Sequence, residues 1–114
     1  MPSWKQRVGA DAERRVRRYY RLRGYRVLDA NARAGGNELD VVVRRGGRLV
    51  FVEVKARAGD SFGDAWEAVG AEKGRRIRHA AEAWLVRRPA LGDLEVGFEA
   101  VAVRGGKIER APFE

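Results

Sequence analysis

The stretch NELDVVVRRGGRLVFVEVKA, residues 37–56, decides the fold of this chain. It contains two runs rich in β-branched and aromatic residues, Glu38 to Arg44 and Arg48 to Lys55, which are separated by Arg45-Gly46-Gly47. Because a glycine pair supplies the positive φ angles that a tight turn requires, the pattern predicts a β-hairpin.

A two-residue turn at Gly46-Gly47 also fixes the register of the two strands. Counting outward from the turn gives four opposed pairs, namely Arg45 with Arg48, Val42 with Phe51, Asp40 with Glu53 and Glu38 with Lys55. Opposed residues share a face of the sheet and side chains alternate with period two, so the four charged groups at 38, 40, 53 and 55 are predicted to converge on one patch. The opposite face is predicted to be core and carries Leu39, Val41, Val43, Val50, Val52 and Val54.

The charged patch requires a compensating positive charge. Two carboxylates about 5 Å apart repel each other by roughly 3 kcal/mol at an effective dielectric constant of about 20. Lys55 supplies one positive charge, and a divalent cation would supply more. Clustered carboxylate oxygens without imidazole or thiolate suit Mg²⁺ or Mn²⁺ rather than zinc. A structural ion-pair network with arginine side chains is the alternative interpretation.

Composition narrows the chemistry that the chain can perform. Its 114 residues are enough for one domain, residues 1–114, with a core of its own, and they include no cysteine. Disulfide scaffolds, thiolate zinc sites and thiol nucleophiles are therefore excluded. His79 is the only histidine, which excludes metal sites built from several imidazoles. Carboxylates, lysines and arginines remain to carry any reaction.

Charge and hydropathy indicate the partners. The chain has 24 Lys and Arg against 16 Asp and Glu, a formal net charge of +8, and most of the cations are arginine. Guanidinium groups bind phosphate bidentately, so this balance favours nucleic acid as the partner, with a well-solvated arginine surface as the alternative. No apolar run approaches the ~20 residues of a membrane span, and charge at Lys5 and Arg7 interrupts any signal-peptide core. We therefore expect a cytoplasmic protein without a membrane partner.

The residues before the hairpin predict a helix, a strand and a loop. Apolar side chains recur at helical spacing from about Trp4 to Arg23, with arginines between them, and Gly24 is placed to end the helix. The segment from Tyr25 to Leu28 predicts a short strand. Asn31 to Asn37, which contains a glycine pair, predicts a loop.

The residues after the hairpin predict a loop and a second long helix. Arg57 to Gly63 is typical of a loop, and Ala65 to Arg88 is largely helical, with Gly70 and Gly74 indicating a short first helix or a bend. Pro89 ends the helix. Its predicted apolar face consists of Ile77, Ala80, Ala81, Trp84 and Leu85.

A last main strand, Leu94 to Val103, follows the long helix, and Gly105-Gly106 leads into an edge strand over Lys107 to Arg110. A helical crossover brings the strand after it in parallel to the strand before it. The order α-β-β-β-α-β therefore predicts an α/β domain of two or three layers, with a central mixed sheet flanked by helices.

Two segments of the hairpin region resemble a known family. Residues 37–42, NELDVV, and residues 51–57, FVEVKAR, look like the signature segments of the YraN-type bacterial proteins. These are small uncharacterised proteins of the restriction-endonuclease-like superfamily, related to archaeal Holliday-junction resolvases, and the resemblance implies that superfamily's core. It covers nearly the whole chain and includes Gly9 to Glu13, Gly24-Tyr25, Asn31, Phe62-Gly63, Val69, Lys73 and Phe98. Two positions depart from the family pattern, Asn37 in place of glycine and Glu99 in place of aspartate.

The resemblance assigns roles to the acidic residues and to one lysine. Asp40 matches the metal-binding aspartate of the superfamily, Glu53 its second acidic ligand, and Lys55 the lysine of the Glu-x-Lys half-motif. Glu38 matches the first acid of the family's Gly-Glu-Ile-Asp stretch. Glu13 matches a helix glutamate that resolvase-like members bring near the metal. Glu13 and Glu38 are candidates for a second metal site or for positioning.

The activity that the resemblance implies is Mg²⁺-dependent DNA endonuclease chemistry, structure-selective in the manner of a Holliday-junction resolvase. Asp40, Glu53 and the backbone carbonyl of Val54 would hold Mg²⁺ or Mn²⁺. Lys55 would orient the attacking water and stabilise charge on the phosphorane. The products would carry 5′-phosphate and 3′-hydroxyl ends.

Basic residues that follow the Glu-x-Lys strand or begin the next helix are predicted to contact backbone phosphates, with ordinary solvated charge as the alternative. They are Arg57, Lys73, Arg75 and Arg76. Two other functions stay open, a non-catalytic nucleic-acid-binding domain that retains the nuclease fold and a protein-interaction module whose acidic patch is structural. A homodimer is a further expectation, because resolvase relatives pair to meet two strands.

Overall fold

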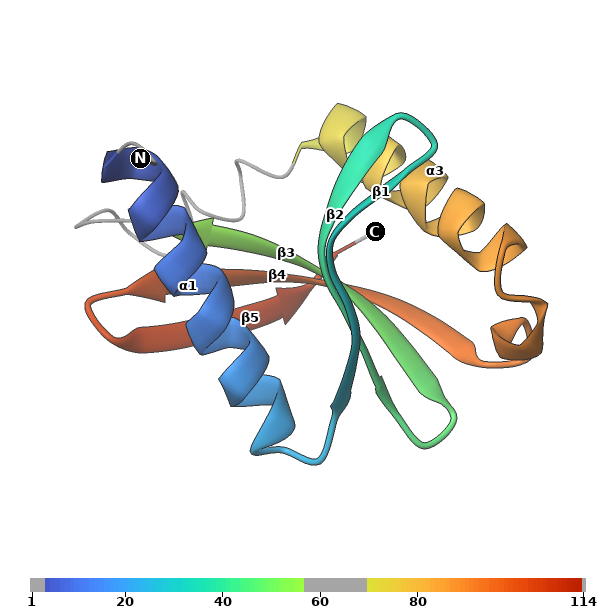
Figure 1. Ribbon diagram of the computed structural model, residues 1–114, viewed down its shortest axis with the longest axis horizontal. Coiled ribbons are helices and arrows are strands. Elements are labelled where there is room, and N and C mark those ends of the chain that lie inside the picture. Colours follow the sequence, from blue (N-terminus) through green and yellow to red (C-terminus); the bar gives the residue numbers. More distant parts are fainter. Residues whose placement is uncertain (1–3, 57–69, 114) are drawn as a thin grey trace.

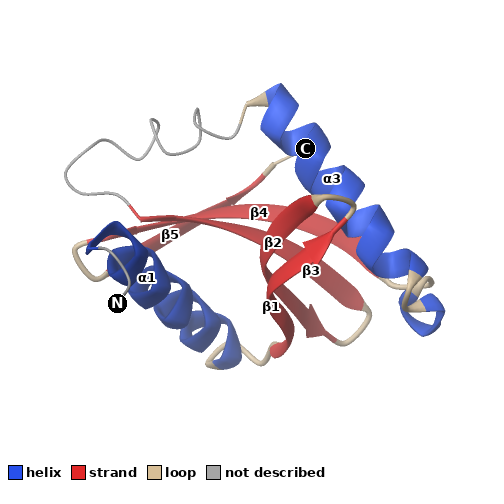
Figure 2. Cartoon of the chain, turned by 45° about the horizontal axis from the view of Figure 1, so that its top comes forward, coloured by secondary structure: helices blue, strands red, loops and turns tan. Residues whose placement is uncertain are grey.

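The computed structural model describes residues 4–56 and 70–113. Two helices cover the two faces of one five-stranded sheet, so the predicted mixed α/β architecture is confirmed with three layers rather than two (Figure 1, Figure 2). The elements in chain order are α1 (Trp4–Arg21), β1 (Arg26–Ala34), β2 (Asn37–Arg45), β3 (Arg48–Ala56), α3 (Ala71–Val86), the 3₁₀ turn η1 (Pro89–Leu91), β4 (Glu95–Arg104) and β5 (Lys107–Pro112).

The sheet has the order β1-β2-β3-β4-β5. All neighbouring strands are antiparallel except β3 and β4, which are parallel as the helical crossover predicts. The register predicted from the glycine turn is confirmed close to that turn, where Arg45 pairs with Arg48 and Val42 with Phe51. The predicted edge strand is also confirmed, as β5.

Each face of the sheet carries its own core. The α1 side includes Val16, Tyr20, Val41, Val43, Val50, Val52 and Val101. The α3 side includes Leu39, Val42, Leu49, Phe51, Ile77, Ala80 and Trp84. The prediction that Leu39 lies on the same face as Val41 and Val43 is wrong. Pairing between β2 and β3 stops at Val41, and the start of β2, which is paired with β1 alone, packs Leu39 against α3 instead.

Gly24 ends helix α1. Gly24 has φ +87°, and the N–H groups of Gly24 and Tyr25 donate to the carbonyls of Arg21 and Tyr20. This pattern is the Schellman motif, which satisfies the last carbonyl groups of a helix and requires a residue that tolerates the left-handed conformation. The chain is thereby turned into β1 where the sequence predicts it.

β1 is longer than predicted. The expected loop from Asn31 to Asn37 is wrong over most of its length, because the strand continues to Ala34 and only Gly35-Gly36 form the turn. The two glycines have φ +56° and +78°, the geometry of a tight hairpin turn. Pairing with β2 along seven register positions overrides the weak strand preference of the alanines and asparagine in this segment.

α3 begins at Ala71 after the N-cap residue Gly70 and ends at Val86. The predicted apolar face is confirmed, with Ile77, Ala80, Ala81 and Trp84 buried. Gly74 is buried inside the helix and does not break it. The short first helix expected before Gly70 falls on residues outside the described part. Among the described helices, none combines the length and apolar character needed to cross a bilayer.

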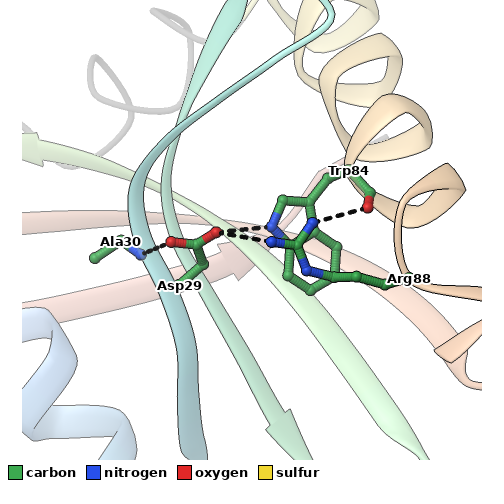
Figure 3. Close-up of polar contacts among 4 residues, drawn as sticks. All are labelled: Asp29, Ala30, Trp84 and Arg88. Atoms are coloured by element: carbon green, nitrogen blue, oxygen red, sulfur yellow. Dashed lines mark hydrogen bonds and ion pairs between the residues drawn. The ribbon is translucent and has the colours of Figure 1, made fainter. Parts of the chain in front are cut away.

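A polar clamp ties the C-terminal end of α3 to β1 (Figure 3). Asp29 lies at a register irregularity of β1, and its Oδ1 accepts a hydrogen bond from the N–H of Ala30. Its Oδ2 accepts one from Trp84 Nε1 at 2.9 Å and lies 3.5 Å from an Arg88 nitrogen. The Arg88 guanidinium stacks 4.0 Å from the centre of a Trp84 ring. The clamp satisfies the indole N–H of a buried tryptophan.

We expect Asp29→Ala to lower the free energy of unfolding by about 1–3 kcal/mol, because the buried Trp84 N–H loses its acceptor. Asp29→Asn retains an acceptor oxygen and should cost less. Urea denaturation of the two variants and the wild-type protein measures the difference. Equal stability of Asp29→Ala and the wild type would show that the clamp contributes nothing.

Candidate active site

β2 and β3 separate where the acidic residues begin. Their paired register ends at Val41 and Val52, and beyond it the strands diverge (Figure 1). The carboxylate of Asp40 reaches across, since its Oδ2 accepts a hydrogen bond from the backbone N–H of Val54 at 2.8 Å. This contact replaces the two strand pairs predicted beyond it, Asp40 with Glu53 and Glu38 with Lys55.

Three carboxylates meet beside this opening. Glu13 comes from α1 and Glu38 and Asp40 come from β2, and one oxygen atom of each lies within 4.8 Å of the others. The amide of Asn31 on β1, with its nitrogen facing Glu13, donates to Glu13 Oε2 at 2.9 Å. Asn31 has φ +51°, a conformation that asparagine adopts more readily than most residues. It is a site residue to which the sequence pattern gave no role.

Burial and neighbouring charge make two of these carboxylates, those of Asp40 and Glu13, hard to ionise. Burial, followed by the Glu53 carboxylate, raises the pKa of Asp40 to about 7, although the hydrogen bond from Val54 opposes this. Burial and the Glu38 carboxylate raise the pKa of Glu13. A divalent cation relieves such repulsion, and a set of oxygen donors alone fits Mg²⁺ or Mn²⁺.

Two lysines, Lys55 and Lys73, contact the carboxylate of Glu53. Its Oε1 atom lies 2.8 Å from Lys73 Nζ and 3.5 Å from Lys55 Nζ, and the residue is only 8% exposed. Burial and the proximity of Lys73 lower the pKa of Lys55. Burial also disfavours the charged form of Lys73, but its hydrogen bond to Glu53, its contact with Lys55 and the charges of Glu53 and Asp40 together outweigh burial and raise the pKa of Lys73. Glu53 is therefore paired with Lys73, and the sequence did not predict this ion pair.

The acidic residues line clefts on both sides of the strand opening. One cleft, of about 330 Å³, is bounded by α1 residues that include Gly9 and Glu13. The other, of about 320 Å³, is bounded by Lys73 and Arg76 of α3. Three β-strand acids line both clefts, Glu38, Asp40 and Glu53. The arrangement can accommodate a cation on the α1 side and an anionic phosphate on the α3 side.

The four predicted phosphate contacts do not form one group. Lys73 and Arg76 both line the α3-side cleft, and Lys73 is also bound to Glu53. Arg75 is exposed and lines neither cleft. Arg57 falls outside the described residues. The one sequence feature that indicated a place for Lys73 near the site is its location in the first turn of α3.

Glu99, one of the two positions expected to depart from the family pattern, does not line either cleft. It is buried on the α1 side of the sheet, where it accepts a hydrogen bond from the Tyr20 hydroxyl and lies 3.7 Å from Arg110 Nη1. Burial and this carboxylate raise the pKa of Tyr20 well above its usual range. Glu99 thus belongs to the packing of α1 on the sheet.

The raised pKa of Asp40 predicts a pH-dependent stability of the metal-free protein. A carboxyl whose pKa is higher in the folded state stabilises the fold fully below about pH 4, and that contribution is lost as the pH rises through about 7. Asp40→Asn removes this loss. We expect the variant to exceed the wild type by about 2–4 kcal/mol in free energy of unfolding at alkaline pH, and to match it at acidic pH. Urea denaturation in EDTA tests this, and a difference independent of pH would contradict it.

The chain resembles bacterial proteins along most of its length. The sequence model of the uncharacterised protein family UPF0102 matches residues 12–103. A UPF0102 protein of Serratia proteamaculans is 38% identical over 106 residues, which is 92% of this chain and 91% of that protein. One of Rhodopseudomonas palustris is 38% identical over 91% of this chain and 78% of its own length. One of Mesorhizobium japonicum is 48% identical over 72% of this chain and 64% of its own length.

The matched residues contain the whole acidic site, from Glu13 on α1 to Lys73 on α3. The family resemblance predicted from the two hairpin segments is therefore confirmed, and the chain belongs to the uncharacterised protein family UPF0102.

Proposed function

We propose that this chain is a Mg²⁺- or Mn²⁺-dependent endonuclease that hydrolyses phosphodiester bonds in DNA, with branched DNA as the preferred substrate. One observation carries the proposal: the carboxylate oxygens of Glu13, Glu38 and Asp40 converge within 4.8 Å next to a pair of lysines. Phosphodiester hydrolysis needs both parts, because negative charge develops on the phosphate while a water molecule must be activated.

The oxygen donors available to a metal ion are the carboxylates of Asp40, Glu13 and Glu38, whose oxygens converge. Glu53 and the carbonyl of Val54 are the further ligands that the family resemblance implies. A bound ion would polarise a phosphate oxygen and lower the pKa of a water molecule. The protein fixes its donors beforehand, since Asn31 holds Glu13 and the Val54 N–H holds Asp40.

The cations of the site have separate tasks in this proposal. Lys73 neutralises Glu53 through the 2.8 Å contact. Lys55, held less closely at 3.5 Å, orients the attacking water and stabilises the charge that develops on the phosphate. Arg76, which lines the α3-side cleft, binds a phosphate oxygen of the DNA backbone.

The proposed substrate has consequences for the location of the protein and for its oligomeric state. A chromosomal DNA substrate places the protein in the cytoplasm. A branched substrate presents two strands to be cut, so the proposal includes a homodimer that supplies two sites. Sedimentation velocity with and without a four-way DNA junction tests the homodimer, which a monomer under both conditions would exclude.

A non-catalytic nucleic-acid-binding domain is the second candidate. The ion pair between Lys73 and Glu53 favours it, because a lysine can neutralise part of the acidic cluster without a metal. In that case the basic surface binds DNA and the acidic residues serve only the fold.

The deciding experiment incubates the purified protein with branched, single-stranded and duplex DNA in Mg²⁺, Mn²⁺ or EDTA. Cleavage that needs the metal and is fastest on branched DNA is the expected result. Binding without cleavage under every condition would replace the first candidate by the second. Calorimetric titration with Mn²⁺ tests the ion separately, and absence of binding would contradict the ligand assignment.

A further inference from the structure

A hollow of about 440 Å³ lies at the opposite end of β2 from the acidic clefts. It is lined by Gly24, Arg26, Leu28, Arg44, Arg45 and Gly46. The start of β1 and the turn between β2 and β3, both near the lower edge of Figure 1, bring its three arginines together. None of these residues belongs to the motifs that define the acidic site.

The arginines of this hollow repel one another. Arg26 and Arg44 are direct partners in the antiparallel pairing of β1 and β2, and like charges at opposed positions destabilise a sheet. Within the described part of the chain, no ion pair involves Arg26, Arg44 or Arg45. Arg48, on the other side of the same turn, lies 2.7 Å from Glu95. Among the described residues the opposed pair Arg26 and Arg44 has no acidic partner, and a bound anion would compensate its charge.

The backbone and an aromatic ring hold two of these side chains in place. Arg45 Nη1 donates to the carbonyl of Arg23 at 3.0 Å, and its guanidinium carbon lies 4.7 Å from the centre of the Tyr25 ring. Arg44 Nε donates to the carbonyl of Gly46 at 2.9 Å. A guanidinium group has five N–H donors, so each side chain keeps donors for a ligand.

We propose that this hollow binds a phosphate group of the DNA backbone, at a position separate from the acidic site. The inference rests on DNA being the ligand in the proposed function. Guanidinium groups bind phosphate bidentately, and the glycines at 24 and 46 leave space without side chains. Asp40 and Arg44 are four residues apart on β2, about 14 Å at the rise of a strand. That distance corresponds to about four base-pair steps of duplex, so one DNA molecule can span both positions.

Arg26→Glu tests the pocket, because it should strengthen the fold while it removes the phosphate site. Glutamate at this position faces Arg44, so a repulsive pair becomes an attractive one and Tm should rise by a few degrees. Affinity for a fluorescein-labelled DNA duplex should fall by about tenfold. The slope of log Kobs against log salt concentration should become shallower by about 1–2, as expected for one or two lost phosphate contacts. Anisotropy titrations in EDTA measure both quantities without cleavage.

Lys107→Glu is the matched control, because Lys107 faces Arg104 across β4 and β5 and does not line the hollow. It makes the same change in net charge and should leave the salt slope unchanged. Equal loss of DNA affinity in both variants, or a salt slope in Arg26→Glu equal to that of the wild type, would overturn the proposed phosphate site. If Arg26→Glu fails to fold, Arg26→Ala must show the shallower slope. A wild-type protein that binds no DNA would overturn the proposed function as well, which separates the two failures.

Discussion

Asp40→Asn is expected to reduce DNA cleavage at least about a thousandfold at saturating Mg²⁺, and to weaken Mn²⁺ binding, while DNA affinity in EDTA stays within about twofold. Asp40 is the acid at which the other parts of the site meet. Its Oδ2 accepts from the Val54 N–H, one of its oxygens belongs to the carboxylate cluster, and the Glu53 carboxylate lies close enough to raise its pKa. Asparagine retains an oxygen for the Val54 hydrogen bond and loses the negative charge that a cation requires.

Glu99→Gln is the control for this substitution. It makes the same chemical change at a buried carboxylate that contacts Tyr20 and lines neither acidic cleft. Cleavage and Mn²⁺ binding should therefore persist in Glu99→Gln. Cleavage at the wild-type rate in Asp40→Asn would locate the reaction elsewhere. A parallel loss in both variants would indicate general damage to the fold.

The part of the site that sequence could predict is the part fixed by local geometry. Gly46-Gly47 sets a tight turn, and the turn sets the register from Arg45 and Arg48 to Val42 and Phe51. The helical crossover then makes β4 parallel to β3 by a chirality that does not depend on detailed packing. These relations involve residues close in sequence or rules common to all such folds, which is why pattern alone was sufficient.

The remainder depends on contacts between distant segments. The strands separate beyond Val41 because the Asp40 side chain takes the Val54 N–H, and a residue pattern does not show which side chain will replace a backbone partner. Asn31 and Glu13 meet only because β1 extends beneath α1. The extension of β1 was missed for a similar reason, since pairing with β2 outweighs the weak strand preference of its sequence.

Lys73 shows the same limit within the site. Its sequence position at the start of a helix is typical of a phosphate contact, and it was predicted to be one. Lys73 lines the α3-side cleft, and its ammonium also lies 2.8 Å from Glu53, closer than Lys55, whose Nζ is 3.5 Å away; this second contact is the one that the sequence did not predict. The spacing between Lys55 and Lys73 in sequence carries no information about this distance, because the direction in which α3 starts is set by its packing on Val42 and Phe51.

The two lysines are expected to respond differently to the same substitution. Lys55→Gln should lower the cleavage rate by about 10²–10³-fold at saturating metal, because it removes the positive charge assigned to the developing negative charge on the phosphate. Lys73→Gln should lower it by about tenfold or less, since glutamine still donates a hydrogen bond to Glu53. Single-turnover cleavage of a branched DNA substrate measures both rates.

The pH dependence separates these roles more sharply than the rates do. Burial and the nearby Lys73 lower the pKa of Lys55, so the wild-type rate should decline at a lower alkaline pH than an ordinary lysine would allow. Removing the charge of Lys73 leaves Lys55 as the only cation beside Glu53 among residues 4–56 and 70–113, and the loss of the neighbouring positive charge raises the pKa of Lys55. The alkaline decline of Lys73→Gln should therefore move to higher pH, and that of Lys55→Arg should disappear because arginine stays charged. An alkaline limb that is the same in the wild type and Lys73→Gln would show that Lys55 is not the group that titrates, and its assigned role would be lost with it.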